Sequence, residues 1–129
     1  MSIARRATLR VAGTVAIGAA VSQMATGVRG VRGFDWRVAT DHLPAVSLAS
    51  LDSELRFYAA WYAVAGVLMH RAANDEALDR ALRPLIAAGW GTAALSRVLS
   101  ARRIGRPDRL FLALGGAELA LAAVLATTK

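Results

Sequence analysis

The sequence predicts an all-α protein, a bundle of four transmembrane helices. The chain has 129 residues and is 56% hydrophobic, with a mean hydropathy of +0.42, yet it carries 16 Lys and Arg against 9 Asp and Glu. Its apolar residues are gathered into four runs with arginines at their ends, and no regular alternation of apolar and polar residues indicates strands. Apolar runs joined by basic connections are typical of multi-pass membrane proteins.

The first apolar run, Val11 to Val28, predicts a helix at about residues 8–28. Its length suits a membrane span, which needs about 20 mostly apolar residues. Two other interpretations are a cleaved secretory signal and a twin-arginine export signal at Arg5 and Arg6. Both require a soluble mature domain, and the three later apolar runs disfavour one.

A polar loop is expected at 29–53, followed by a second helix at 54–73. This helix is free of charged residues only from Phe57 to Met69, which is short for a membrane span. A flanking arginine such as Arg56 can extend its charged head toward the interface and so lengthen the usable segment. The second span is therefore predicted to have charged ends.

The third helix is expected at 82–101, where Pro84 suits a first helical turn because its missing amide hydrogen needs no partner there. Gly105 then marks a break between helices. The fourth helix is expected at 108–128; it is the most hydrophobic of the four and contains one acid, Glu118.

A soluble bundle is the main structural alternative. In such a bundle each helix shows a polar face to water, so charged residues recur between apolar ones. The segments 57–69 and 110–117 contain no charged residue on any side. Four helices of a short chain cannot cover one another completely, so lipid is expected to provide the covering.

Charged residues within these runs define a candidate polar site. Glu118 lies nine residues after Arg109, roughly 13 Å along a helix, and an unpaired charge at that depth costs at least ~2.5 kcal/mol. Arg97 is the first candidate partner and Arg56 the second. The pair is either a structural tie between helices or part of a proton or substrate site. The candidate polar intramembrane cluster comprises Glu54, Arg56, Arg97 and Glu118.

Aromatic residues gather on the same side as this cluster if the chain crosses four times. The candidate pocket-lining residues are Phe57, Tyr58, Trp61 and Tyr62. An aromatic belt at one membrane interface is the favoured interpretation. A ligand-lining pocket is the alternative, because the aromatic residues coincide with the charged cluster.

Several chemistries are not expected. The chain has no cysteine, and its two histidines, His42 and His70, are expected on opposite sides, so no metal site is predicted. No catalytic arrangement or phosphate-binding loop is present, so no cofactor and no enzymatic activity are expected. The sequence pI is about 11.4, but no nucleic-acid recognition motif accompanies the arginines, so nucleic acid is not an expected partner.

The sequence between about Ser53 and Ala126 resembles a known family. The residues that carry the resemblance are Glu54-Leu55-Arg56-Phe57-Tyr58, Arg97-Val98-Leu99-Ser100, Gly105-Arg106-Pro107 and Glu118. Their order and spacing are similar to those of the small bacterial membrane proteins grouped as domain of unknown function 4345. The resemblance implies a four-helix bacterial membrane protein and no particular activity. The positions that it marks are Glu54, Arg56, Arg97, Gly105, Pro107 and Glu118.

We therefore expect a small integral membrane protein that acts as a non-enzymatic scaffold or accessory subunit. The alternative is a small carrier or lipid-handling protein with a polar intramembrane pocket around Glu118 and Arg97. The expected partners are the lipid bilayer and either a second copy of the chain or a membrane partner protein. The expected location is the inner membrane of a bacterium, crossed several times.

Overall fold

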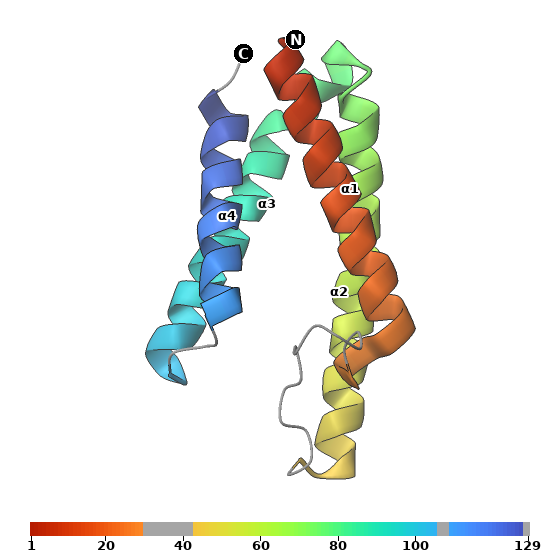
Figure 1. Ribbon diagram of the computed structural model, residues 1–129, viewed down its shortest axis with the longest axis vertical. Coiled ribbons are helices and arrows are strands. Elements are labelled where there is room, and N and C mark those ends of the chain that lie inside the picture. The colour runs from red at the N-terminus through yellow and green to blue at the C-terminus, as the bar shows by residue number, and fades with distance from the viewer. Residues whose placement is uncertain (30–42, 106–108, 128–129) are drawn as a thin grey trace. The chain divides into compact units, whose positions relative to one another are not determined.

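The computed structural model describes residues 1–29, 43–105 and 109–127. The described chain is all-α, as the sequence predicts, and has four long helices (Figure 1). Their bounds are α1 Ile3–Thr26, α2 Ala45–Ala72, α3 Glu76–Arg103 and α4 Arg109–Thr127, and a short 3-10 turn, η1 Gly27–Arg29, follows α1. His42 and Pro107 lie outside the described residues.

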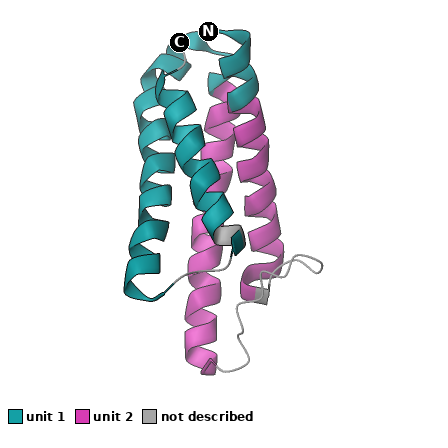
Figure 2. Cartoon of the chain, turned by 60° about the vertical axis from the view of Figure 1, so that its left-hand side comes forward, with its two compact units in different colours: residues 1–8, 72–129 teal, residues 9–71 magenta. Residues whose placement is uncertain are grey.

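The chain divides into two compact units (Figure 2). One unit consists of Met1–Thr8 and Ala72–Lys129, and so contains the first turns of α1 together with α3 and α4. The other unit is Leu9–Arg71, and contains the rest of α1 packed with α2. We describe each unit by itself and refer to them as the α3–α4 unit and the α1–α2 unit.

α2 begins earlier than the sequence suggests, at Ala45 instead of residue 54. Pro44 directly precedes it, and the carbonyl of Pro44 accepts a hydrogen bond from the amide of Leu48 at 3.0 Å. Proline favours a helix start because its φ angle is already helical and its nitrogen has no hydrogen to satisfy. The second part of the predicted loop 29–53 is therefore helical.

α3 also begins earlier than predicted, at Glu76 instead of residue 82. The Asp75 carboxylate accepts hydrogen bonds from the amides of Ala77 and Leu78 at 2.9 and 3.0 Å, which satisfies two amides of the first turn. Pro84 consequently lies inside α3 and does not open it. A proline there cannot donate to the carbonyl four residues earlier, so one hydrogen bond of the helix is missing.

α3 ends where the sequence predicts a break. The amide of Ile104 still donates to the carbonyl of Ser100 at 2.9 Å, and Gly105 then adopts a positive φ of 126°. Glycine adopts this conformation without the steric penalty of a side chain, which ends the helix.

Among the described residues, no helix combines the length and the hydropathy that identify a candidate membrane span.

The two helices of the α1–α2 unit approach closely at a pair of glycines. A Cβ atom placed on Gly66 would lie 2.6 Å from Cγ1 of Ile17 and 2.8 Å from the carbonyl oxygen of Gly13. A Cβ atom placed on Gly13 would lie 2.9 Å from the carbonyl oxygen of Gly66. No real Cβ is found at such distances, so the backbones meet only because both positions lack a side chain.

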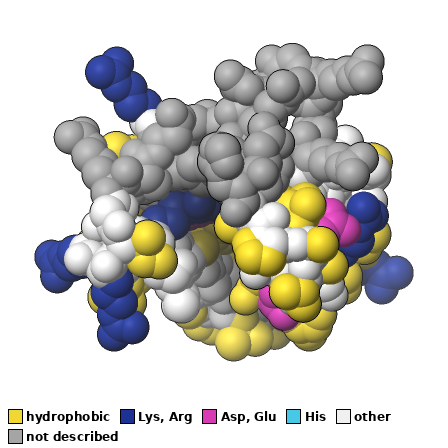
Figure 3. All heavy atoms as spheres, turned by 90° about the horizontal axis from the view of Figure 1, so that it is seen from below, with side chains coloured by type: hydrophobic (Ala, Val, Ile, Leu, Met, Phe, Trp, Pro, Cys, Tyr) yellow, Lys and Arg dark blue, Asp and Glu magenta, His cyan; other side chains and the backbone are white. Residues whose placement is uncertain are grey.

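Most buried apolar positions hold alanine, with Leu9, Met69 and Leu125 as fully buried larger side chains, whereas many large apolar side chains are exposed. On α1, Ala12, Ala16 and Ala20 are at most 6% exposed, while Val11 and Val15 are more than 60% exposed. α2 and α4 show the same distribution, with Ala59 and Ala122 buried and Val64 and Leu119 exposed. The space-filling view shows hydrophobic side chains uncovered on the surface beside arginines that project outward (Figure 3).

Candidate functional site

Arg97 and Glu118 form a two-pronged ion pair within the α3–α4 unit. Nε of Arg97 donates to one carboxylate oxygen of Glu118 at 2.8 Å, and Nη2 donates to the other at 2.7 Å. Glu118 is only 7% exposed. Glu118 thus has the partner that the sequence favours, and both of its oxygens accept a charge-assisted hydrogen bond.

Gly115 makes room for this pair on α4. A Cβ atom at Gly115 would lie 3.3 Å from Cδ of Arg97, whereas a Cβ atom at Gly116 would meet nothing within 4 Å. Gly115 precedes Glu118 by three residues, and side chains three positions apart lie on one face of a helix. The side chain of Arg97 therefore passes over Gly115 on its way to Glu118.

Arg56 belongs to a second polar cluster, at the end of α1 within the α1–α2 unit. Its Nε donates to the Asp52 carboxylate at 2.8 Å, and its Nη1 donates to the carbonyl oxygen of Met24. Asp52 also accepts a hydrogen bond from the amide of Val28 at 2.8 Å. Gly27 has a positive φ of 54°, and a Cβ atom there would overlap the Asp52 carboxylate. We call Asp52 and Arg56 the α1-end cluster.

The four charged residues proposed from the sequence are divided between the two units. Arg97 and Glu118 lie in the α3–α4 unit, whereas Glu54 and Arg56 lie in the α1–α2 unit. Arg56, the second candidate partner of Glu118, pairs with Asp52 instead. Glu54 is exposed on α2.

A third polar cluster, which sequence reasoning missed, is the most deeply buried. Nε and Nη2 of Arg5 both donate to the Asp79 carboxylate, with the shortest contacts at 2.8 Å, and Nη1 donates to the carbonyl oxygen of Leu125 at 2.8 Å. Arg83 adds a contact to Asp79 at 3.0 Å. Arg5 is 1% exposed and Asp79 is fully buried. The spacing of Asp79 and Arg83 by four residues was the available signal, because it favours a pair on one helix face.

These contacts lower the pKa of two acids that precede the apolar part of α3. The Arg5 guanidinium, which donates to Asp79, holds the pKa of that carboxyl below its usual range despite the opposing effect of burial, and Arg83 adds to the shift. The terminal amine of Met1 donates to Glu76 at 2.9 Å and lowers the pKa of Glu76. Both acids are therefore held in their charged form.

The four aromatic residues proposed from the sequence are arranged along α2. Phe57, Tyr58 and Trp61 are each more than 50% exposed, and the ring of Phe57 makes edge-to-face contacts with Tyr58 and Trp61, at centroid distances of 5.7 and 6.4 Å. Tyr62 is half-buried. We call Phe57, Tyr58 and Trp61 the aromatic cluster.

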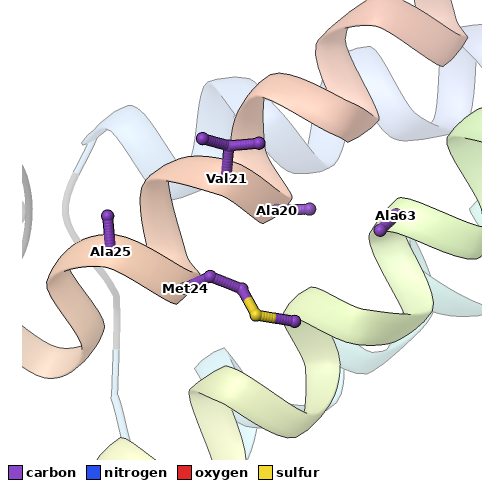
Figure 4. Close-up of a pocket in the computed structure, with 5 residues that line it drawn as sticks. All are labelled: Ala20, Val21, Met24, Ala25 and Ala63. Carbon is purple, nitrogen blue, oxygen red and sulfur yellow. The ribbon is translucent and has the colours of Figure 1, made fainter.

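An open apolar groove lies in the same unit, with a volume of about 470 Å³ (Figure 4). The residues that line it are Ala20, Val21, Met24, Ala25 and Ala63. None of the four aromatic residues is among them. None of its lining side chains is charged or a hydrogen-bond donor, so the wall of the groove is apolar.

Two of the described ion pairs connect helices. Arg97–Glu118 connects α3 with α4, and Arg5–Asp79 connects the start of α1 with α3. Within the ranges that the structure covers, no three histidine or acidic side chains come close enough to hold a metal ion. The arrangement defines a class of small helical protein whose helices are held by ion pairs and small-residue contacts.

Comparison with protein families gives the same family as the sequence resemblance. The family model described as Domain of unknown function (DUF4345) matches residues 4–128. The chain therefore belongs to this family. The match extends beyond Ser53–Ala126, where the resemblance was recognised, and includes α1. No curated protein and no solved structure matches the chain.

Proposed function

We propose that this protein is a small integral membrane protein that acts as a non-enzymatic scaffold or accessory subunit. The observation that carries the proposal is the distribution of side-chain sizes: alanine and glycine fill most buried positions, whereas many large apolar side chains are exposed. In water, burial of the large side chains would be favoured by about 25 cal/mol per Å² of apolar surface. In lipid that preference disappears, and helices pack through small residues that let their backbones approach.

The composition of α4 gives further support. α4 has 19 residues, and its only charged residues are Arg109 at its first position and the ion-paired Glu118. Leu112, Leu119 and Val124 are each at least 39% exposed on it. A helix that is apolar on all sides needs an apolar surrounding, which a bilayer provides.

Membrane topology can be tested because the natural chain has no cysteine. Single cysteines are introduced at three exposed sites, Ser47→Cys in α2, Ala77→Cys in α3 and Ile104→Cys after α3, and labelled with a membrane-impermeant thiol reagent in intact cells. Four crossings predict that Ser47→Cys and Ile104→Cys react from one side and Ala77→Cys from the other. Labelling of all three from one side, or release of the protein from membranes by alkaline extraction, would refute the proposal.

The scaffold role is favoured over the carrier alternative by the contacts of Glu118. A carrier that moves protons or a polar substrate through this site needs a carboxylate that can exchange partners. Both oxygens of Glu118 accept hydrogen bonds from Arg97, and the side chain is almost fully buried. Such geometry suits a permanent tie between α3 and α4.

Carboxyl modification separates the two roles. A hydrophobic carbodiimide reacts with protonated carboxyl groups in apolar surroundings, and mass spectrometry locates the modified residue. We expect no modification of Glu118 in the natural protein and clear modification in Arg97→Leu, which removes its partner. Rapid modification of Glu118 in the natural protein, blocked by a transported compound, would instead support a carrier.

A further inference from the structure

The aromatic cluster lies where the sequence of α2 changes from polar to apolar. Before it, the segment Ala45–Arg56 contains three serines and the three charged residues Asp52, Glu54 and Arg56, whereas Phe57 to Met69 contains no charged residue. The change occurs within one turn of helix. Such a boundary is expected where a helix passes from water into hydrocarbon.

The aromatic cluster is exposed although its three side chains are large and mainly apolar. Phe57, Tyr58 and Trp61 are 56%, 54% and 60% exposed. Their rings are held by edge-to-face contacts to Phe57, at interplanar angles of 70° and 73°, so they form a fixed apolar surface. Tyrosine and tryptophan each combine an apolar ring with one polar hydrogen, which suits a surface that is apolar on one side and wet on the other.

Within the α1–α2 unit, the end of α1 lies beside the part of α2 that precedes the aromatic cluster. The α1-end cluster connects Arg56 to the carbonyl of Met24 and Asp52 to the amide of Val28. α1 therefore ends beside the turn of α2 that directly precedes the aromatic cluster. Both helices change from apolar to polar at one level, as two spans do at one face of a bilayer.

The length of α2 agrees with this placement. α2 has 28 residues, about 42 Å at 1.5 Å per residue, whereas the hydrocarbon core of a bilayer is about 30 Å thick. Part of α2 must then extend into water. Its polar part is the one before Phe57.

We propose that Phe57, Tyr58 and Trp61 form an interfacial anchor that lies at the headgroup boundary of a phospholipid bilayer, with the α1-end cluster on its aqueous side. The occupant of this aromatic surface is lipid. The inference rests on the proposed membrane function and adds the depth of α2 in the bilayer.

Tryptophan quenching tests the anchor. In the double variant Trp36→Phe/Trp90→Phe, Trp61 is the only tryptophan left of the natural three. The protein is reconstituted into phosphatidylcholine vesicles that carry bromine either near the headgroup or near the end of the acyl chains. The anchor predicts a larger loss of Trp61 emission with shallow bromine than with deep bromine. The matched variant Trp36→Phe/Trp61→Phe retains only Trp90, in the middle part of α3, and should lose more emission with deep bromine.

Other results would overturn the anchor. A greater loss with deep bromine would place the ring within the bilayer, loss only with aqueous iodide would place it in water, and no loss with either would mean that a partner protein or a second copy covers it. Flotation of the vesicles separates this failure from that of the membrane proposal. Protein that floats with the vesicles but gives one of these patterns overturns only the anchor; protein that does not float overturns the membrane proposal and the anchor with it.

Discussion

The α1–α2 unit and the α3–α4 unit differ in the main contacts between their helices. α1 and α2 approach closely at Gly13 and Gly66, and the α1-end cluster adds polar contacts between α2 and the end of α1. α3 and α4 are tied by Arg97 and Glu118, and a second buried pair, Arg5 with Asp79, ties the start of α1 to α3. Close backbone contact depends on the absence of side chains, whereas an ion pair depends on the presence of both partners.

This difference has a consequence for mutation. At a glycine crossing, the damage comes from adding atoms, because neighbouring atoms have no room to move. At a buried ion pair, the damage comes from removing one partner, because the other charge stays buried without compensation. Adding a side chain is therefore expected to destabilise the glycine crossing, whereas removing a charged side chain is expected to destabilise the ion pair.

The largest effect is expected at Asp79. Asp79→Leu leaves the buried guanidinium of Arg5 without its carboxylate, which should lower the free energy of unfolding by about 3–5 kcal/mol. The measurement is denaturant unfolding of detergent-solubilised protein, followed by circular dichroism. The double variant Arg5→Met/Asp79→Leu should recover most of the loss, because well-packed apolar groups can replace a buried pair.

Arg6→Ala is the matched control for this prediction. Arg6 is adjacent to Arg5 but exposed, so its loss should change the free energy of unfolding by no more than about 0.5 kcal/mol. If Asp79→Leu were no more harmful than Arg6→Ala, the buried cluster would not contribute to stability.

The glycine crossing should respond to a single methyl group. Gly66→Ala places a Cβ against Ile17 and the Gly13 carbonyl, and such overpacking typically costs about 1–3 kcal/mol. Gly18→Ala is the control, since a Cβ there meets nothing within 4 Å and alanine should stabilise the helix by roughly 0.5–1 kcal/mol. Unfolding in the same detergent measures both. Equal stabilisation by the two substitutions would show that the helices do not approach at Gly66.

The sequence predicted the α3–α4 tie better than the other contacts, for a physical reason. Glu118 is the only charged residue within an apolar run, so an unpaired charge there would be energetically costly. Arg97, on the preceding helix, is close enough in the sequence to be expected as its partner. Arg5 and Asp79 lie at the ends of apolar runs, where charges are ordinarily solvated, and 74 positions separate them in the chain. The residues next to Arg5 and Asp79 in the sequence do not distinguish these two charges from charges on the surface.

The glycine crossing was also beyond prediction from sequence. The chain contains 11 glycines, and only the three-dimensional register of α1 against α2 selects Gly13 and Gly66. A Cβ atom at Gly18, on the same helix as Gly13, would meet no neighbour within 4 Å. The early start of α2 had a visible signal, Pro44, but the serines and acids after it resembled a loop.

Acid should weaken the Arg5–Asp79 tie. The pKa of Asp79 is lower in the folded protein than the ordinary value of about 3.9 for an aspartate, so the unfolded chain binds more protons between the two pKa values. Stability contributed by Asp79 is thus fully present above about pH 4 and is lost as the pH falls through the folded pKa. Unfolding curves between about pH 6 and pH 2 should show the natural protein losing stability relative to Arg5→Met/Asp79→Leu, which lacks this group.

The acid dependence of Glu76 follows the same direction, since the amine of Met1 lowers its pKa. Because Glu76 remains in the double variant, its contribution cancels from the difference between the two proteins. A pH-independent difference between the natural protein and the double variant would contradict the assignment of the low pKa to Asp79.

The smallest expected effect separates Gly115 from its neighbour Gly116. Alanine at Gly116 meets nothing and should stabilise α4 by roughly 0.5–1 kcal/mol, whereas alanine at Gly115 crowds Cδ of Arg97 and should gain less. In an Arg97→Ala background this obstacle is gone, so the two alanine substitutions should become equivalent. The double-mutant cycle isolates the interaction between positions 97 and 115. A cycle with no interaction energy would mean that Arg97 does not pass over Gly115, and the route by which it reaches Glu118 would have to lie elsewhere on α4.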